Sequence, residues 1–450
     1  MKVKKLDINN FRGFRKATIE FSDSNLAVFI GTNGQGKSSV LDLLAMFLTK
    51  FTNPLYKLYN PKFSKEPSIE VEYFDINSSS QFTVNSIFLI VENDSDLPFF
   101  EEESLIELDV AVSIMGKSPD QDQHRKQFFD FLDNLGQRTY TDEKISVPVL
   151  LYYRANRFFD NNYKPLKNEV NYRATQFAAY ENAFSKKITN FNDFVNWFRI
   201  EEDKENELIK KERNFDLTSP NLQTVRKSII TFFSKLNSST FKNLRVEREQ
   251  PKAPNFSFAG TYSSLAITKN DQDFRLEQLS DGEKMLLMVV CDIARRLSIA
   301  NPGLDDPLIG KGVVLIDEIE LHLHPKWQRE VIPALLATFP SIQFIVTTHS
   351  PQVLSRVDQK DIFLLDDGEI LHLSSNPKGL DTNAILEEIM DTPKYPKEVD
   401  ALVNKLFTLI QQKQFKQAEV IREQVKVASP DNPALSRADA MMERLKVLNS

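Results

Sequence analysis

The sequence predicts an α/β fold, with a parallel sheet joined to an antiparallel β subdomain, a helical insertion and a helical C-terminal tail. Three observations carry this prediction. A short apolar run at 26–30, typical of a buried strand, ends at a glycine-rich loop, after which 38–50 shows helical spacing. From Val313 onward, strand-like and helix-like segments alternate, as they do around a parallel sheet. From about residue 384 the pattern is helical only.

The composition limits the classes of protein that fit. The chain has 450 residues and a net charge of −7, so any contact with DNA would need a local basic patch. Cys291 is the only cysteine, which excludes an intramolecular disulfide and fits a reducing compartment. The N-terminus lacks the apolar segment of a signal peptide, and no run of about 18 apolar residues occurs. We therefore expect a cytoplasmic protein that does not contact a membrane.

The N-terminal part of the chain predicts several strands. Apolar and polar residues alternate between Leu6 and Phe21, which is typical of half-buried strands. Residues 147–153 (VPVLLYY) predict a further buried strand. Three more segments are typical of an antiparallel meander, at 68–76, 82–92 and 106–115.

The middle of the chain, from about 160 to 250, is aromatic and highly charged. Its most charged stretch, EEDKENELIKKER at 201–213, is typical of a solvated helix, and we interpret the segment as a helical insertion. No sustained heptad repeat occurs between Ser38 and Leu279, so a long coiled-coil arm is not expected. Strand patterns return at 255–267.

A phosphate-binding loop is predicted at 31–38, where GTNGQGKS matches G-x-x-x-x-G-K-[ST] between a strand and a helix. Its glycines let the backbone wrap closely around phosphate groups, and the N-terminus of the following helix favours an anion. We expect Lys37 to reach the β- and γ-phosphates of ATP and the hydroxyl of Ser38 to bind Mg²⁺. The residues expected to contact the nucleotide here are Asn33, Gly34, Gln35, Gly36, Lys37, Ser38 and Ser39.

A hydrolytic centre is predicted at the end of the strand 313–316. Two carboxylates, Asp317 and Glu318, follow the apolar residues VVLI, at the edge where α/β sheets bind ligands. We expect Asp317 to hold the Mg²⁺ shell and Glu318 to polarise the attacking water. Two successive carboxylates beside a phosphate-binding loop therefore favour hydrolysis of ATP over binding alone.

Four further motifs carry a resemblance to a known class of ATPase. LSDGEK at 279–284 resembles the ABC signature loop, and DEIELHLHP at 317–325 resembles the DEPE…LHP run of that class. TTHSP at 347–351 resembles its switch-histidine loop, and NNFRGF at 9–14 is similar to RecF-like and OLD-like N-termini. The motifs arrive in the order found in ABC, SMC and RecF-like ATPases, so the chain is identified as a member of that class.

The resemblance is close over 1–50 and about 270–370 and loose in between. It departs from the transporter pattern at Asp281 and Glu283, where transporters have Gly and Gln. Both residues are common in the RecF-like branch, so we interpret them as markers of that branch.

The resemblance implies an ABC-type fold in which two copies pair head to tail around ATP. Ser280 and Gly282 of one copy, with Glu283 beside them, would lie against the γ-phosphate held in the loop of the other copy. His349 would read the same γ-phosphate. The glutamine of the lobe-switch loop has no clear counterpart, and Arg157 is the candidate near the expected place, with a surface arginine as the alternative.

Two histidines remain outside these roles. His322 and His324 could suggest a metal pair, but a spacing of two residues on a loop is poor for metal binding and favours a structural role.

Among such ATPases, the chain resembles compact members of bacterial anti-phage operons, most of all the Septu ATPase family, PtuA. That family implies a regulatory or scaffolding ATPase beside an HNH-type endonuclease, with DNA reached through the complex. A RecF-like repair or recombination ATPase that binds DNA directly is the alternative, and a transporter ATPase is disfavoured by the RecF-like N-terminus. The residues after Gly368 lack the strand-borne carboxylates of a TOPRIM nuclease, so no nuclease centre is expected in this chain.

These observations divide the chain into four expected parts. The last part, a helical tail, has apolar residues at helical spacing, which fits packing within the protein and also a dock for a nuclease partner. The parts are 1–160, the first ATPase lobe; 161–254, the helical insertion; 255–380, the second lobe with the signature loop and switch histidine; and 381–450, the tail.

Overall fold

The structure is a computed structural model of the chain, and it describes residues 1–60, 82–91, 104–113, 122–156, 175–185, 191–236, 239–249, 262–390, 392 and 395–447. The chain forms two compact units, which we call unit 1 (Met1–Lys378) and unit 2 (Gly379–Ser450). Unit 1 contains all the motifs that the sequence links to nucleotide chemistry.

A six-stranded sheet forms the centre of unit 1, with the strand order β13-β12-β3-β11-β10-β6. Neighbouring strands run parallel except β13, which pairs antiparallel with β12. Every residue of β3, β6, β10 and β11 is buried, as expected of a parallel sheet with both faces covered. The strands are β3 (Leu26–Ile30), β6 (Val149–Tyr153), β10 (Gly312–Ile316), β11 (Ile342–Thr347), β12 (Ile362–Asp366) and β13 (Glu369–His372).

The strand order brings three sequence motifs to one edge of the sheet. β11 lies between β3 and β10, and all three strands run parallel, so the loops that follow them open at the same edge. β3 leads into the loop 31–36, β10 ends just before Asp317, and β11 ends at Thr347. The sheet topology therefore assembles the candidate site from segments up to about 300 residues apart in the sequence.

A second, antiparallel sheet has the order β2-β1-β4-β5. In its β1–β2 pair, Leu6 and Ile8 lie opposite Ile19 and Ala17, so the alternating apolar residues share one face. The predicted meander segments 82–92 and 106–115 contain β4 and most of β5, whereas 68–76 lies outside the described residues. The strands are β1 (Lys2–Phe11), β2 (Phe14–Glu20), β4 (Phe82–Val91) and β5 (Ser104–Ser113).

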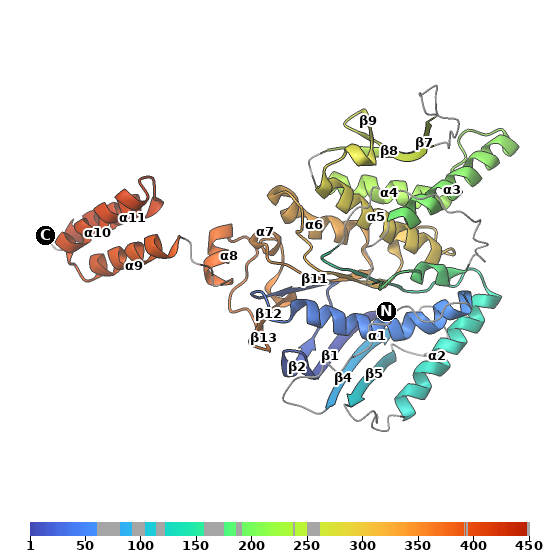
Figure 1. Ribbon diagram of the computed structural model, residues 1–450, viewed down its shortest axis with the longest axis horizontal. Helices are drawn as coiled ribbons and strands as arrows, with labels where there is room; N and C mark the ends of the chain where they lie inside the picture. Colours follow the sequence, from blue (N-terminus) through green and yellow to red (C-terminus); the bar gives the residue numbers. More distant parts are fainter. Residues whose placement is uncertain are drawn as a thin grey trace, which may run out of the picture. The chain divides into compact units, whose positions relative to one another are not determined.

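Helices cover both faces of the central sheet. α1 and the antiparallel sheet lie on one side of it, and α4, α5 and α6 lie on the other (Figure 1). α1 extends nine residues beyond the predicted end at Lys50, because its buried face continues through Phe51 and Leu55. The helices of unit 1 are α1 (Lys37–Tyr59), α2 (Asp122–Thr141), α3 (Phe191–Glu212), α4 (Pro220–Lys235), α5 (Asp281–Ala300), α6 (Pro325–Thr338) and α7 (Pro351–Leu354).

The predicted helical insertion contains α3 and α4 but is not helical throughout. The prediction of helix is wrong for residues 241–249, because they form strand β7 in a three-stranded sheet with the order β7-β8-β9. Phe241 and Leu244 of β7 are buried, and Phe241 packs against Phe233 of α4. The strands of this sheet are β7 (Phe241–Glu249), β8 (Tyr262–Lys269) and β9 (Gln272–Arg275).

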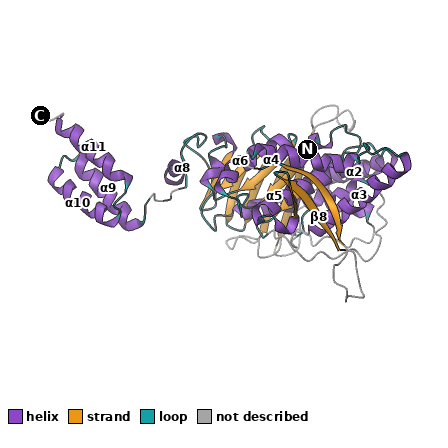
Figure 2. Ribbon diagram, turned by 90° about the horizontal axis from the view of Figure 1, so that it is seen from above, coloured by secondary structure: helices purple, strands orange, loops and turns teal. Residues whose placement is uncertain are grey.

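Unit 2 is helical, as the sequence predicts. Helices α9, α10 and α11 pack around a core that includes Leu406, Ala418 and Ala438 (Figure 2). Its helices are α8 (Thr382–Glu388), α9 (Lys397–Gln411), α10 (Phe415–Ala428) and α11 (Pro433–Val447). The predicted fold class is confirmed: a parallel α/β sheet, an antiparallel β subdomain, inserted helices and a helical C-terminal tail.

Across the described ranges, the helices are all too short or too polar to cross a membrane.

Candidate functional site

The loop between β3 and α1 adopts a conformation that requires glycine. Gly31, Gly34 and Gly36 have φ angles of 145°, 89° and 93°, which side-chain-bearing residues rarely adopt. A Cβ on Gly31 would collide with the carbonyl oxygen of Leu365, and a Cβ on Gly36 would lie 2.7 Å from the ring of Phe14. The loop backbone is therefore held close to its neighbours at the N-terminus of α1, where backbone N–H groups favour an anion.

Lys37 is the buried cation of this loop. Its Nζ donates to the carbonyl oxygens of Gly31 and Thr32, both at 2.9 Å, and the residue is only 7% exposed. Burial lowers the pKa of Lys37, whereas the charges of Asp317, Glu318 and, more weakly, Glu320 act in the opposite direction. The charge of Lys37 is therefore stabilised by the carboxylates that follow β10.

Three oxygen-bearing side chains meet at the end of β10. The hydroxyl of Ser38 donates to both carboxylate oxygens of Asp317, at 3.1 and 2.9 Å. Thr347 Oγ1 donates to Asp317 Oδ1 at 2.6 Å. The N–H of Asp317 donates to the carbonyl oxygen of Tyr153 at 2.9 Å, which fixes the aspartate to the end of β6. The structure thus brings together the two predicted metal ligands, Ser38 and Asp317, and adds Thr347, which the sequence prediction missed.

Glu318 is held in an uncommon backbone conformation. Its φ is 49°, in the left-handed region that few residues other than glycine enter, and its N–H donates to Thr347 Oγ1 at 2.7 Å. The Thr347 hydroxyl therefore fixes the peptide of Glu318 as well as the carboxylate of Asp317. Thr347 lies thirty residues after Asp317, at the end of the neighbouring strand, so its role can be recognised only when the strand order is known.

The switch-histidine segment is positioned by Glu320. Glu320 Oε1 accepts from the N–H of His349 at 2.6 Å, and Glu320 Oε2 accepts from Thr348 Oγ1 at 2.7 Å. Ser350 then caps α7 by accepting from the N–H groups of Gln352 and Val353. Glu320 is not among the predicted site residues, although its position as the last carboxylate of DEIE is a signal that could have identified it.

Two of the predicted nucleotide contacts have partners within the chain. The side chain of Gln35 donates to Asp366 at 3.5 Å and accepts from the N–H of Asp367 at 2.8 Å, which ties the loop to the β12–β13 turn. Ser39 accepts from Arg12 at 3.3 Å. Asn33 and Gly34 lie exposed in the loop. The nucleotide contacts of these four residues, like those of Gly36, Lys37 and Ser38, stay predictions.

Arg157, the candidate for the lobe-switch position, lies outside the described residues. Arg154, three residues earlier, follows β6 directly and pairs with Asp42 of α1 at 2.8 Å. Arg12 pairs with the other oxygen of Asp42, also at 2.8 Å, and the guanidinium of Arg154 lies 4.4 Å from the centre of the Tyr152 ring. Two arginines that the site prediction omitted therefore lie one helical turn beyond Ser38.

The signature loop is closed by hydrogen bonds of its own. Ser280 caps α5 in a capping box, accepting from the N–H of Glu283 at 3.4 Å while its own N–H donates to Glu283 Oε2 at 3.0 Å. Lys269 of β8 pairs with Glu283 Oε1 at 2.6 Å. A Cβ on Gly282 would lie 2.7 Å from the carbonyl oxygen of His322, so the loop after β10 packs directly on the signature loop.

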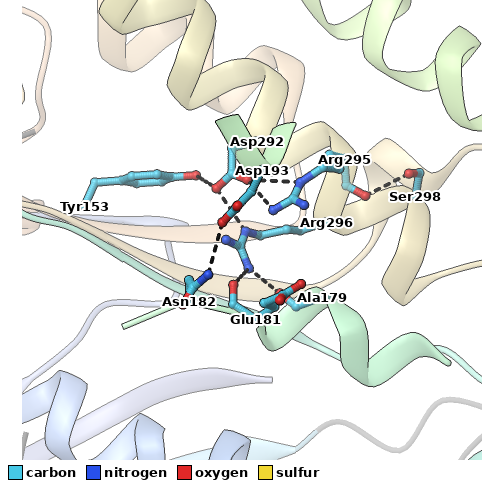
Figure 3. Close-up of polar contacts among 9 residues, drawn as sticks. All are labelled: Tyr153, Ala179, Glu181, Asn182, Asp193, Asp292, Arg295, Arg296 and Ser298. Atoms are coloured by element: carbon cyan, nitrogen blue, oxygen red, sulfur yellow. Dashed lines mark hydrogen bonds and ion pairs between the residues drawn. The ribbon is translucent and has the colours of Figure 1, made fainter. Parts of the chain in front are cut away.

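The signature helix α5 is anchored by a buried charge cluster (Figure 3). Asp292 accepts from the hydroxyl of Tyr153 at 2.8 Å, from Arg295 at 2.8 Å and from Arg296 at 2.9 Å. Burial alone would raise the pKa of Asp292, but the charges of Arg296 and Arg295 outweigh it and hold the pKa at about 2. Because the carbonyl of Tyr153 also accepts from the N–H of Asp317, this strand end joins α5 to the residue that follows β10.

The two loop histidines have structural positions. His324 caps α6 by accepting from the N–H of Lys326 at 3.3 Å, and His322 adopts a left-handed φ of 62°. Within the ranges that the structure describes, no group of three or more His, Cys, Asp and Glu side chains is arranged to hold a metal ion.

Comparisons with known proteins place these motifs in context. A family model described as "AAA domain, putative AbiEii toxin, Type IV TA system" matches residues 26–355. A protein of Vibrio cholerae serotype O1 biovar El Tor, named "Retron Vc95 probable ATPase", is 30% identical over 92% of this chain and 84% of its own length. The Septu protein PtuA of Bacillus thuringiensis is 22% identical over 96% of this chain and 95% of its own length.

Among solved structures, an SMC head bound to the C-winged helix domain of ScpA is similar at 17% identity and a TM-score of 0.44, covering 83% of this chain and 98% of that one. The predicted resemblance to ABC-like defence ATPases, with Septu PtuA among the relatives, is confirmed.

Proposed function

The chain belongs to the AAA domain family whose model covers residues 26–355, and from that premise we propose a specific function for it. The protein is an ATPase that pairs head to tail around ATP and thereby regulates or scaffolds an HNH-type nuclease in antiviral defence. The observation that carries the ATPase assignment is the convergence of Ser38, Asp317 and Thr347 at the strand ends beside the buried Lys37.

Each residue of this cluster has a chemical task in the proposal. Lys37 binds the β- and γ-phosphates, exchanging its two carbonyl partners for phosphate oxygens. Ser38 and Asp317 present the hard oxygen ligands that Mg²⁺ prefers, so the residues present fit this ion. Mg²⁺, when bound, would neutralise charge on the phosphates. Glu318 takes the proton of the attacking water, and His349 donates to the γ-phosphate.

The second half of the proposal is pairing between copies. Ser280 and the N-terminus of α5 form an exposed anion-binding end, and Gly282 lets the neighbouring backbone approach closely. In a two-fold pair, this end of one copy faces the γ-phosphate held by Lys37 of the other, which makes two composite sites. Nucleotide then acts as a ligand that shifts the chain between unpaired and paired states.

The partner assignment rests on the relatives. The resemblance to Septu PtuA supports a nuclease partner of HNH type, with DNA reached through the complex. Val420 and Val427 of α10 in unit 2 are exposed apolar residues that such a partner would cover. The single cysteine, Cys291, is buried and free, which supports a cytoplasmic location.

The pairing step is tested with Glu318→Gln. The glutamine keeps the backbone bond to Thr347 but cannot take a proton, so turnover should fall about a hundredfold while ATP and Mg²⁺ hold a stable pair. Light scattering after size exclusion should give twice the chain mass for Glu318→Gln with ATP, and the single mass without it. Equal ATP turnover by Glu318→Gln and the unchanged protein would overturn the role of Glu318.

The partner step is tested by co-purification. An HNH nuclease encoded beside this chain should co-purify with it, and its DNA cleavage should change with ATP in the unchanged protein. Tight, salt-sensitive DNA binding by the chain alone, with no co-purifying nuclease, would favour a RecF-like role instead.

A further inference from the structure

The signature loop carries a buried acid whose charge needs an explanation. Glu283 is 7% exposed in its side chain and lies in the first turn of α5. Its Oε2 accepts from the N–H of Ser280 at 3.0 Å and from the hydroxyl of Ser280 at 2.9 Å. The negative charge therefore stands directly behind the residue that the proposed function places against a γ-phosphate.

A neutral glutamine, the residue found at this position in transporters, would make similar hydrogen bonds without a charge. A carboxylate is well placed in a capping box and favoured by the helix dipole. Both effects concern the single chain, however. When a second copy brings the phosphates of ATP to the same helix end, an uncompensated carboxylate there would repel them.

Lys269 supplies the compensating charge. Its Nζ lies 2.6 Å from Glu283 Oε1, whereas Ser280 donates to the other carboxylate oxygen, Oε2. The ammonium lies 5.8 Å from the ring centres of both Phe241 and Phe274, so the two aromatic faces of the β7–β9 sheet hold it in place. Burial would raise the pKa of Glu283, but the bonds from Lys269 and Ser280 lower it below its usual range, which keeps the carboxylate ionised.

We propose that Lys269 is a positioning residue of the composite ATP site. It neutralises Glu283, holds the carboxylate against Ser280, and so lets the signature loop approach the phosphates bound by another copy. This inference rests on the proposed head-to-tail pairing. The ion pair between Lys269 of β8 and Glu283 of α5 takes the place of the neutral glutamine. ATP-dependent pairing therefore depends on Lys269, a residue outside the signature motif.

The competing explanation is that Lys269 only packs between two rings. A double-mutant cycle separates the two, because the charge explanation requires coupling between Lys269 and Glu283 and the packing explanation does not. The variants are Lys269→Met, which keeps the apolar stem, Glu283→Gln, which keeps the hydrogen-bonding shape, and the double variant. All are made in the Glu318→Gln background, so that hydrolysis does not dissolve the pair.

The measured quantity is the ATP concentration that gives half-maximal pairing in analytical ultracentrifugation. Lys269→Met should raise it about tenfold, because a buried charge is left without its partner. Glu283→Gln should lower it, since the positive charge of Lys269 then faces the phosphates without a carboxylate beside it. The double variant should return to within about threefold of the parent, and Lys269→Arg should behave like the parent.

Several outcomes overturn the proposal. If the double variant pairs as poorly as Lys269→Met, the lysine acts by packing alone, and if Lys269→Met pairs like the parent, it has no role in pairing. Should Lys269→Met fail to give a cooperative melting transition, Glu283→Gln decides: weaker pairing than the parent contradicts the charge argument. If the parent does not pair in the presence of ATP, both the proposed function and this inference are overturned. If the parent pairs and Lys269→Met pairs equally well, only this inference is overturned.

Discussion

The two halves of the proposed composite site are built in different ways. In the phosphate-loop half, the ends of β3, β10 and β11 meet, and Ser38 and Thr347 both donate to Asp317, across 279 and 30 residues of sequence. In the signature half, Ser280 bonds to Glu283 three residues later, and Lys269 from one hairpin completes the group. The first half joins strands that are distant in sequence. In the second half, the polar groups at the N-terminus of α5 hydrogen-bond to residues of the same helical turn.

This difference predicts where each half acts. The phosphate-loop half holds a buried cation, its carboxylates and the candidate metal ligands in a single chain, so changes there should affect nucleotide binding and chemistry in any copy. The signature half has an exposed helix end whose polar groups already have partners within the chain. Changes there should leave nucleotide binding intact and act only when two copies meet.

The largest expected effect is at Lys37. Lys37→Ala removes the only charge that faces Asp317 and Glu318 from the loop and should weaken ATP binding about a hundredfold or more. Isothermal titration of ATP and Mg²⁺ into the purified chain measures this. The matched control is Lys57→Ala, an exposed lysine in the last turn of the same helix, which should bind normally. If Lys37→Ala bound ATP with an affinity within threefold of that of the unchanged protein, the assignment of the loop 31–38 as the phosphate-binding loop would be contradicted.

The next effect separates the two halves. Ser280→Arg removes the cap of α5 and places a long side chain at the exposed helix end, so ATP-dependent pairing and turnover should fall about thirtyfold while ATP binding stays within threefold. Titration and light scattering on the same sample test both parts. Ser234→Arg, at an exposed serine of α4, controls for the added charge. Loss of ATP binding in Ser280→Arg would contradict the assignment of the signature half to a second copy.

The sequence predicted much of the phosphate-loop half because each of its motifs is short and local, although the strand order is what brings the motifs together. Gly31, Gly36 and Lys37 act through one loop, and Asp317 follows a strand that is apolar throughout, so spacing alone placed them. Thr347 and Lys269 could not be found this way. A threonine at a strand end and a lysine in a hairpin are common residues, and only the pairing of β11 with β10 and of β8 with β7 gives them a role.

The fold was predictable to a similar degree. The short apolar runs of β3 and β10 predict buried strands, as the structure shows, whereas the prediction of helix is wrong for β7. Its sequence, FKNLRVERE, is polar at most positions, and its strand conformation depends on packing of Phe241 on α4 and on pairing with β8. When the apolar residues of a strand are placed by a tertiary contact, its sequence need not show the alternation of apolar and polar residues that predicts a strand.

A smaller effect is expected at Thr347, inside the phosphate-loop half. Thr347→Val keeps the shape of the side chain but removes the hydroxyl that bonds Asp317 and the N–H of Glu318, which should slow turnover about tenfold with little change in ATP affinity. Steady-state kinetics give the kcat and KM separately. Thr338→Val is the matched control, because that buried hydroxyl bonds only a helix carbonyl in α6. A rise in KM with unchanged kcat would mean that Thr347 serves binding and not the geometry of the hydrolytic centre.

The smallest effect concerns Tyr153, which touches both halves through Asp317 and Asp292. Tyr153→Phe removes one hydrogen bond to a buried carboxylate and should cost about 1 kcal/mol, or roughly fivefold in the unfolding equilibrium. Denaturant unfolding measures this, and Tyr140→Phe, at an exposed tyrosine of α2, should cost nothing. A loss of turnover well beyond the loss of stability would mean that the hydroxyl couples the halves and does more than support α5.

The pH dependence of the stability of Tyr153→Phe tests whether the hydroxyl of Tyr153 keeps Asp292 ionised. The pKa of Asp292 is about 2 in the folded chain against an ordinary value of 3.8, so its contribution to stability is complete above 3.8 and is lost as the pH falls through about 2. Removing the tyrosine hydroxyl should raise the folded pKa toward the ordinary value, which shrinks the contribution at neutral pH and narrows the acid window in which it disappears. Arg295 and Arg296 remain in Tyr153→Phe, so most of the depression of the pKa should persist. Acid unfolding curves that are identical with and without the hydroxyl would therefore assign the ionisation of Asp292 to the two arginines alone and leave Tyr153 as a link through its backbone carbonyl.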